Sequence, residues 1–173
     1  MATTASQKTL LIIWHSRTGA AQQMAQAARQ GAQEVIHELE ATHSLRIVCQ
    51  RAADTQPEDL RQADAYLFCA PENLAALSGE MKEFFDRNYY PVLGQLNGRP
   101  YALLVSAGTD GAMAVKQAER IAQGWRLSRA HPSLIVNTRA QTPEAILAPK
   151  QITPQNQADC AEIGGTLAAL LLL

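Results

Sequence analysis

The strongest constraint on the fold is a regular alternation of short apolar runs with longer amphipathic stretches. Residues 10–14 form a continuous apolar run, which is typical of a strand that is covered on both faces. Further strands are predicted at residues 45–49, 65–70 and 101–106, and residues 127–137 are predicted to hold a fifth, most clearly around Ile135. Helices are predicted at residues 18–39, 57–60, 78–88, 111–123 and 155–172. This order predicts one α/β domain over residues 1–173, with an open, doubly wound sheet of five parallel strands in the order 2-1-3-4-5 and helices on both faces.

Two segments have further local signals. Pro71 is expected to end the third strand, and Ser78 is a candidate N-cap for the helix that follows. Residues 138–153 contain Pro143 and Pro149, so we expect an irregular segment there, with a turn at residues 144–147 as its one regular feature.

Composition excludes several classes of protein. The chain has 173 residues, 47% of them hydrophobic, and a formal net charge of −1, so it lacks the basic field that attracts nucleic acid. Cys49, Cys69 and Cys160 have no metal-binding spacing, and Cys49 and Cys69 are predicted to be buried thiols in a reducing cytoplasm. No secretory signal is evident, and the apolar C-terminal run is shorter than the roughly 20 residues that span a bilayer.

The first strand is followed by the loop His15-Ser16-Arg17-Thr18-Gly19. A loop of this kind between a buried strand and a helix is suited to hold a phosphate, because backbone amides, hydroxyls and the helix N-terminus all favour an anion. No Walker lysine and no Gly-x-Gly-x-x-Gly pattern is present, so a monophosphate is favoured over a nucleoside triphosphate or a dinucleotide.

The turns after the first, third and fourth strands are expected to form one crevice. In the order 2-1-3-4-5 these strands are neighbours, and ligands of such sheets bind beyond the carboxyl ends of the strands. Residues 15–21, 71–78 and 107–111 are therefore predicted to meet there.

The residues of these three turns carry a resemblance to a known family. The loop at residues 15–19, Pro71-Glu72-Asn73-Leu74 with the helix that follows it, and Ala107-Gly108-Thr109-Asp110-Gly111 resemble the flavodoxin-like family of FMN-binding proteins. More closely, they resemble its NAD(P)H-dependent FMN and quinone reductase branch, which includes the WrbA-like proteins. The resemblance implies a flavodoxin-like fold and FMN as the cofactor.

The resemblance also implies a set of cofactor-binding residues. The first loop would hold the FMN phosphate, the second would lie along the ribityl chain and the flavin ring, and the third would close on the flavin from the other side. The residues are Ser16, Arg17, Thr18, Gly19, Ala20 and Ala21; Pro71, Glu72, Asn73 and Leu74; and Ala107, Gly108, Thr109 and Gly111.

The activity implied is an oxidoreductase that passes electrons from NAD(P)H through FMN to a quinone or another small acceptor. The flavin supplies this chemistry, and we find no candidate catalytic side chain or metal ligand in the sequence. Relatives form homodimers or homotetramers, and residues 88–93 offer apolar and aromatic surface for such an interface.

Two alternatives remain open at this point. The chain departs from the family pattern at Ala20-Ala21, where relatives have a glycine and a hydroxyl residue, and at residues 74–76, where relatives have an aromatic stretch. These changes are compatible with a non-catalytic, flavodoxin-like protein that has weakened FMN binding. A flavodoxin-type electron carrier would share the fold, although the net charge of −1 does not match the acidic surface of such carriers.

Overall fold

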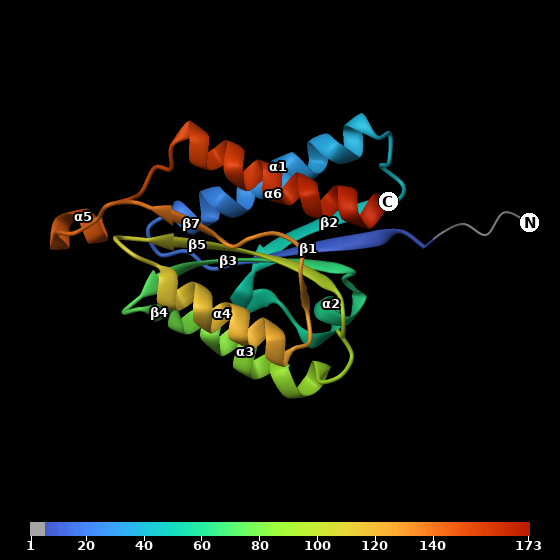
Figure 1. Ribbon diagram of the computed structural model, residues 1–173, viewed down its shortest axis with the longest axis horizontal. Helices are drawn as coiled ribbons and strands as arrows, with labels where there is room; N and C mark the ends of the chain where they lie inside the picture. Colours follow the sequence, from blue (N-terminus) through green and yellow to red (C-terminus); the bar gives the residue numbers. More distant parts are fainter. Residues whose placement is uncertain (1–5) are drawn as a thin grey trace, which may run out of the picture.

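A seven-stranded sheet separates two layers of helices in the computed structural model, which describes residues 6–173 (Figure 1). Helices α1 (Ala20–Glu38) and α6 (Pro154–Leu172) cover one face. Helices α2 (Pro57–Gln62), α3 (Gly79–Val92) and α4 (Ala112–Gly124) cover the other. The short helix α5 (Pro143–Leu147) projects from the edge where the strands end.

The strand order confirms the predicted doubly wound topology. The parallel strands lie in the order β2 (Leu45–Arg51), β1 (Lys8–Trp14), β3 (Ala65–Asn73) and β5 (Pro100–Ala107). The fifth position beside β5 is occupied by β6 (Ser128–Arg129) and β7 (Leu134–Asn137), both parallel to it. The short strand β4 (Ala76–Leu77) pairs antiparallel with the end of β3.

The sheet has seven strands rather than the predicted five, and two short strands account for the difference. The strand predicted around Ile135 is confirmed as β7, and the separate strand β6 precedes it; residues 130–133 between them include Pro132, which has no N–H to donate to a ladder. Strand β4 was not predicted, since two residues give no periodic signal.

The central strands alternate between two cores. On β1, Leu10 and Ile12 face the layer of α1 and α6, while Leu11 and Ile13 face α2, α3 and α4. The second core is aromatic: Phe68 of β3 lies against Phe85 of α3 with ring centroids 5.0 Å apart. Because both faces of β1 are covered, all four of these side chains are at most 1% exposed.

Helix boundaries differ modestly from the sequence expectations. Helix α1 begins at Ala20, and the Leu39 side chain just after it is 55% exposed rather than part of the buried face. Helix α3 continues past residue 88 to Val92, with Pro91 in its last turn.

The Cys49 side chain is half-buried, whereas Cys69 is buried as predicted. No helix of the described residues is long and apolar enough to cross a bilayer.

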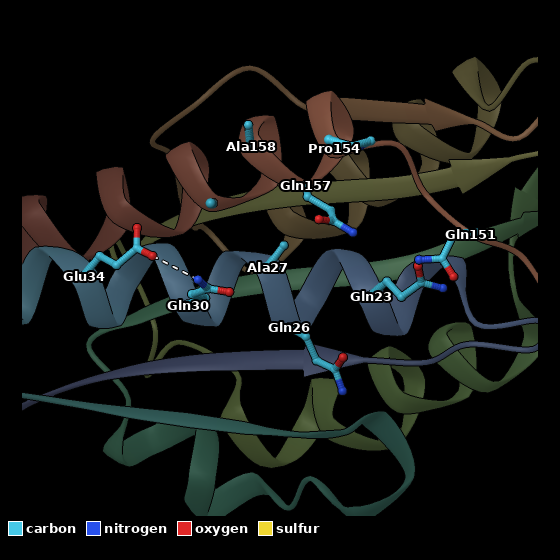
Figure 2. A pocket seen from close by; sticks show the side chains of 10 residues that line it. Gln23, Gln26, Ala27, Gln30, Glu34, Gln151, Pro154, Gln157 and Ala158 are labelled. Atoms are coloured by element: carbon cyan, nitrogen blue, oxygen red, sulfur yellow. Dashed lines mark hydrogen bonds between the residues drawn. The ribbon is translucent and has the colours of Figure 1, made fainter.

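Helices α1 and α6 cross at very short distance because glycine occupies both sides of the contact. A Cβ atom on Gly31 would stand 2.0 Å from the Ala161 carbonyl oxygen, and one on Gly164 would stand 1.9 Å from the Ala28 carbonyl oxygen. Beside this crossing lies an open groove of about 530 Å³, and half of the residues that line it are glutamines (Figure 2).

We expect Gly164→Ala to destabilise the protein by about 1–3 kcal/mol, because its methyl group would overlap backbone atoms that cannot move aside. Chemical unfolding monitored by circular dichroism measures the change. Gly124→Ala is the matched control: a Cβ there meets nothing within 4 Å, so its stability should stay near that of the parent. Equal stability of the two variants would contradict this account of the crossing.

Candidate functional site

Three loops meet at the carboxyl end of the sheet, as the topology predicts. The first loop follows Trp14 at the end of β1, the second is the hairpin formed by β3 and β4, and the third follows Ala107 at the end of β5 (Figure 1). The sheet is continuous across these strands, so the loops begin side by side.

The first loop presents backbone donors. Gly19, with φ +98°, is the N-cap of α1, and its amide donates to the Ser16 hydroxyl at 3.1 Å. Within residues 6–173, the amides of Ala20, Ala21 and Gln22 have no recorded acceptor, as expected for the first turn of a helix without a side-chain cap. Amides at a helix N-terminus beside two hydroxyls, those of Ser16 and Thr18, fit an anionic phosphate.

Ala20 and Ala21 take part in this loop through their backbone alone. Both side chains are at most 3% exposed and pack in the core under α1 together with Met24. The Cys69 thiol donates to the Ala21 carbonyl at 3.1 Å. Compared with the family pattern, the two alanines therefore lack one hydroxyl donor but leave the backbone amides at the start of α1 in place.

Arg17 is paired within the protein rather than free. Its guanidinium donates to both carboxylate oxygens of Glu80 at 3.2 Å. With the Asn73 amide oriented to suit its neighbours, Asn73 Oδ1 accepts from Arg17 Nε at 3.0 Å. These contacts tie the first loop to the second, and binding of a phosphate by Arg17 stays a prediction.

The His15 side chain also connects the first loop to the second loop and to the start of α3. Its Nδ1 lies 2.9 Å from the Ser78 hydroxyl, and its Nε2 lies 3.7 Å from Glu80 Oε1. Ser78 stands at the predicted N-cap position of α3, but its hydroxyl is engaged with His15 and does not cap the helix. Burial lowers the pKa of His15, with the positive charges of Arg17 and Arg51 acting in the same direction and Glu80 opposing them.

The second loop is a tight hairpin. The prediction that Pro71 ends β3 was wrong. The strand continues to Asn73, and Pro71 still pairs in register with Ser106 of β5. Asn73 then faces Ala76 across the two-residue turn Leu74-Ala75, whose φ values are +52° and +63°. The Leu74 side chain at the tip is fully exposed.

The third loop is short and backed by β7. Gly111 has φ +86°, and a Cβ there would stand 2.9 Å from Ile135, so both the conformation and the space require glycine. Ala107 is buried, while Thr109 is exposed and its carbonyl accepts from the Asn137 side chain. A Cβ on Gly108 would stand 2.9 Å from the Ala140 carbonyl oxygen.

Sequence reasoning missed a fourth component, residues 138–153, which we call the strap. At one end the Thr138 amide donates to the Ala107 carbonyl at 2.8 Å, beside the third loop. At the other end the Lys150 amide donates to the Thr18 carbonyl at 2.7 Å, in the first loop. The prolines correctly indicated an irregular segment, but nothing in the pattern of residues 138–153 signals where it lies.

Comparisons with known proteins agree with this geometry. The pattern of a family described as NADPH-dependent FMN reductase matches residues 14–136. A NAD(P)H dehydrogenase (quinone) of Acidithiobacillus ferrooxidans is 30% identical over 116 residues, which are 58% of this chain and 58% of that protein. The chain thus matches just over half the length of this curated relative.

Two solved structures show the likeness in fold. An archaeal flavodoxin superposes with a TM-score of 0.73 at 16% identity, covering 95% of this chain and 99% of that one. A flavodoxin, WrbA-like protein from Agrobacterium tumefaciens superposes with a TM-score of 0.64 at 14% identity, covering 96% and 98%. The predicted flavodoxin-like fold is confirmed.

We expect the double change Leu74→Asn and Ala75→Gly to raise the free energy of unfolding by about 1–2 kcal/mol. Asparagine and glycine adopt positive φ at low cost, whereas leucine and alanine are strained there. Urea unfolding measures the gain. Leu39→Asn is the control, since Leu39 is also exposed but has φ −91°; a similar gain there would argue against relief of turn strain.

Proposed function

Because the chain belongs to the family of NADPH-dependent FMN reductases, we propose that it binds FMN in the crevice between the three loops and passes electrons from NAD(P)H to a quinone or another small acceptor. The observation that carries this proposal is the first loop, where the amides of Ala20, Ala21 and Gln22 at the α1 N-terminus have no acceptor within residues 6–173 and the Ser16 hydroxyl accepts from the Gly19 amide beside them. The match of the family over residues 14–136 includes all three loops.

The residues of the crevice have distinct proposed roles. Ser16, Thr18 and the amides of Gly19, Ala20 and Ala21 hold the phosphate. The hairpin from Pro71 to Leu74, with Glu72 and Asn73, borders the ribityl chain and one edge of the ring. Ala107, Gly108, Thr109 and Gly111 close the other side. Arg17 acts from the rim, where it already joins the first loop to Asn73 and Glu80.

The protein's part in the reaction is to bind and orient. FMN, when bound, supplies hydride and electron transfer, so the crevice needs no nucleophile of its own. The exposed Leu74 side chain at the hairpin tip, and Met113 at the start of α4, give the rim of the crevice apolar surface for a planar acceptor. The Ala20-Ala21 pair leaves fewer donors for the phosphate than a loop with an added hydroxyl, so we expect FMN to be bound reversibly.

The experiment that tests this function is a fluorescence titration of FMN into protein stripped of flavin. We expect quenching with a dissociation constant at or below the micromolar range, followed by NADPH or NADH oxidation when a quinone is supplied. Thr18→Val removes one hydroxyl from the phosphate side and should weaken FMN binding by about 1.5–3 kcal/mol, roughly 10- to 100-fold. Thr42→Val, at an exposed position in the α1–β2 connection, is the control.

The outcomes separate the competing functions. Folded protein that does not quench FMN would contradict the proposal and favour a non-catalytic binding protein. Tight FMN that NADPH and NADH fail to reduce, but that a separate reductase does reduce, would favour a flavodoxin-type electron carrier.

We also propose that the protein acts in the cytoplasm as a homodimer or homotetramer. Cys49, Cys69 and Cys160 are free thiols, which suits a reducing compartment. Tyr90 and Leu93, at the end of α3, are 79% and 53% exposed and supply apolar surface for self-association.

Sedimentation equilibrium of the parent and of Tyr90→Lys tests the self-association. We expect the parent to sediment as a dimer or tetramer and the variant to shift toward the monomer. Leu170→Lys, which changes an exposed leucine of α6 instead, should leave the assembly intact. A monomeric parent protein at micromolar concentration would rule out this part of the proposal.

A further inference from the structure

Gln23, in the second turn of α1, joins the strap to the first loop more extensively than any predicted site residue does. Its side-chain amide donates to the Gly19 carbonyl at 3.1 Å and to the Lys150 carbonyl at 2.7 Å. Its side-chain oxygen accepts from the Ile152 amide at 3.2 Å. A single neutral side chain thus bonds to three backbone groups on two segments that lie far apart in the sequence.

The strap is itself held in shape at this point by Lys150. The Lys150 ammonium donates to the carbonyls of Ala145, Ile146 and Ala148, which are at or just after the end of α5. With its charge engaged there, Lys150 contacts the first loop through its backbone: its amide donates to the Thr18 carbonyl, and its carbonyl accepts from Gln23.

These bonds fix the direction of the first loop's amides. The Thr18 carbonyl is held by the Lys150 amide of the strap, and the Gly19 carbonyl accepts from both the backbone amide and the side chain of Gln23. In a planar trans peptide the N–H points opposite to the carbonyl, so the Gly19 amide is directed away from the strap and the Ala20 amide away from Gln23. The Gly19 amide accordingly meets the Ser16 hydroxyl, and the Ala20 amide is one of those left without an acceptor in the described chain.

We propose that Gln23 is a positioning residue for the cofactor's phosphate, acting through Gly19, Lys150 and Ile152 to aim the amides of the first loop. The inference rests on the proposed FMN site and adds to it a residue that does not itself touch the cofactor. Gln23 lies at one end of the groove between α1 and α6, near Gln151, and Figure 2 shows Gln26 on the next turn pointing away from the strap.

The test compares two flavins that differ only in the phosphate. Gln23→Met keeps the length of the side chain but removes its hydrogen bonds. We expect it to weaken FMN binding about tenfold, the loss that corresponds to roughly one net hydrogen bond, and to leave riboflavin binding within about twofold. Gln26→Met is the matched control, because Gln26 lies on the same helix and groove and its side chain makes no hydrogen bond within residues 6–173; it should change neither affinity.

If Gln23 had a purely structural role, its substitution would weaken the binding of FMN and riboflavin equally. An equal loss of affinity for both flavins would therefore overturn the proposal, and so would an unchanged affinity for FMN. Hydrogen exchange in the flavin-free protein gives a readout that does not depend on the cofactor. We expect the Lys150 and Ile152 amides to exchange faster in Gln23→Met than in the parent and in Gln26→Met.

The two proposals can fail separately. If the parent binds neither flavin, the proposed FMN site fails, and the exchange rates still decide whether Gln23 holds the strap on the loop. If the parent binds FMN but exchange and FMN affinity are unaffected in Gln23→Met, the site stands and the role of Gln23 is overturned.

Discussion

The burial of β1 on both faces and along both edges is the constraint on which the rest of the structure depends. Its residues Leu10 to Ile13 are almost wholly buried, and it pairs with β2 on one side and β3 on the other. Because β1 is an inner strand, the polar segment that follows it leaves the sheet between two neighbouring strands and not at an outer edge. The loop after Trp14 is therefore placed at an inner position of the carboxyl edge, beside the end of β3, and β3 and its neighbour β5 carry the other two loops.

Much of this arrangement is encoded locally and was predictable. The apolar run at residues 10–14 and the alternation that follows it indicate a parallel sheet, and the sheet order brings the three loops together. Glycine at positions 19 and 111 is consistent with the left-handed conformations that begin α1 and α4. These features depend on short stretches of sequence, which is why pattern and spacing were enough.

Contacts between distant segments were not predictable from the pattern. From the sequence, Arg17 is predicted to bind the phosphate, but the sequence does not indicate that its guanidinium is hydrogen-bonded to Glu80 and Asn73. In the sequence, nothing distinguishes Gln23 from the other glutamines on the polar face of its helix. Its hydrogen bonds to Lys150 and Ile152 join segments that lie far apart in the chain, so only the folded structure shows them. A turn was predicted over residues 71–78, but the β3–β4 hairpin within it was not, because neither Leu74 nor Ala75 favours the positive φ that a two-residue hairpin imposes.

The glycine crossing of α1 and α6 also has a consequence for biosynthesis. The core beneath α1 is completed by α6 residues such as Ile163 and Leu167, which come far later in the chain. On the ribosome, β1, α1 and β3 emerge first and leave that face of the sheet without half of its cover until α6 has been made. The apolar face of the earlier elements therefore stays partly exposed until α6 is made and docks on it.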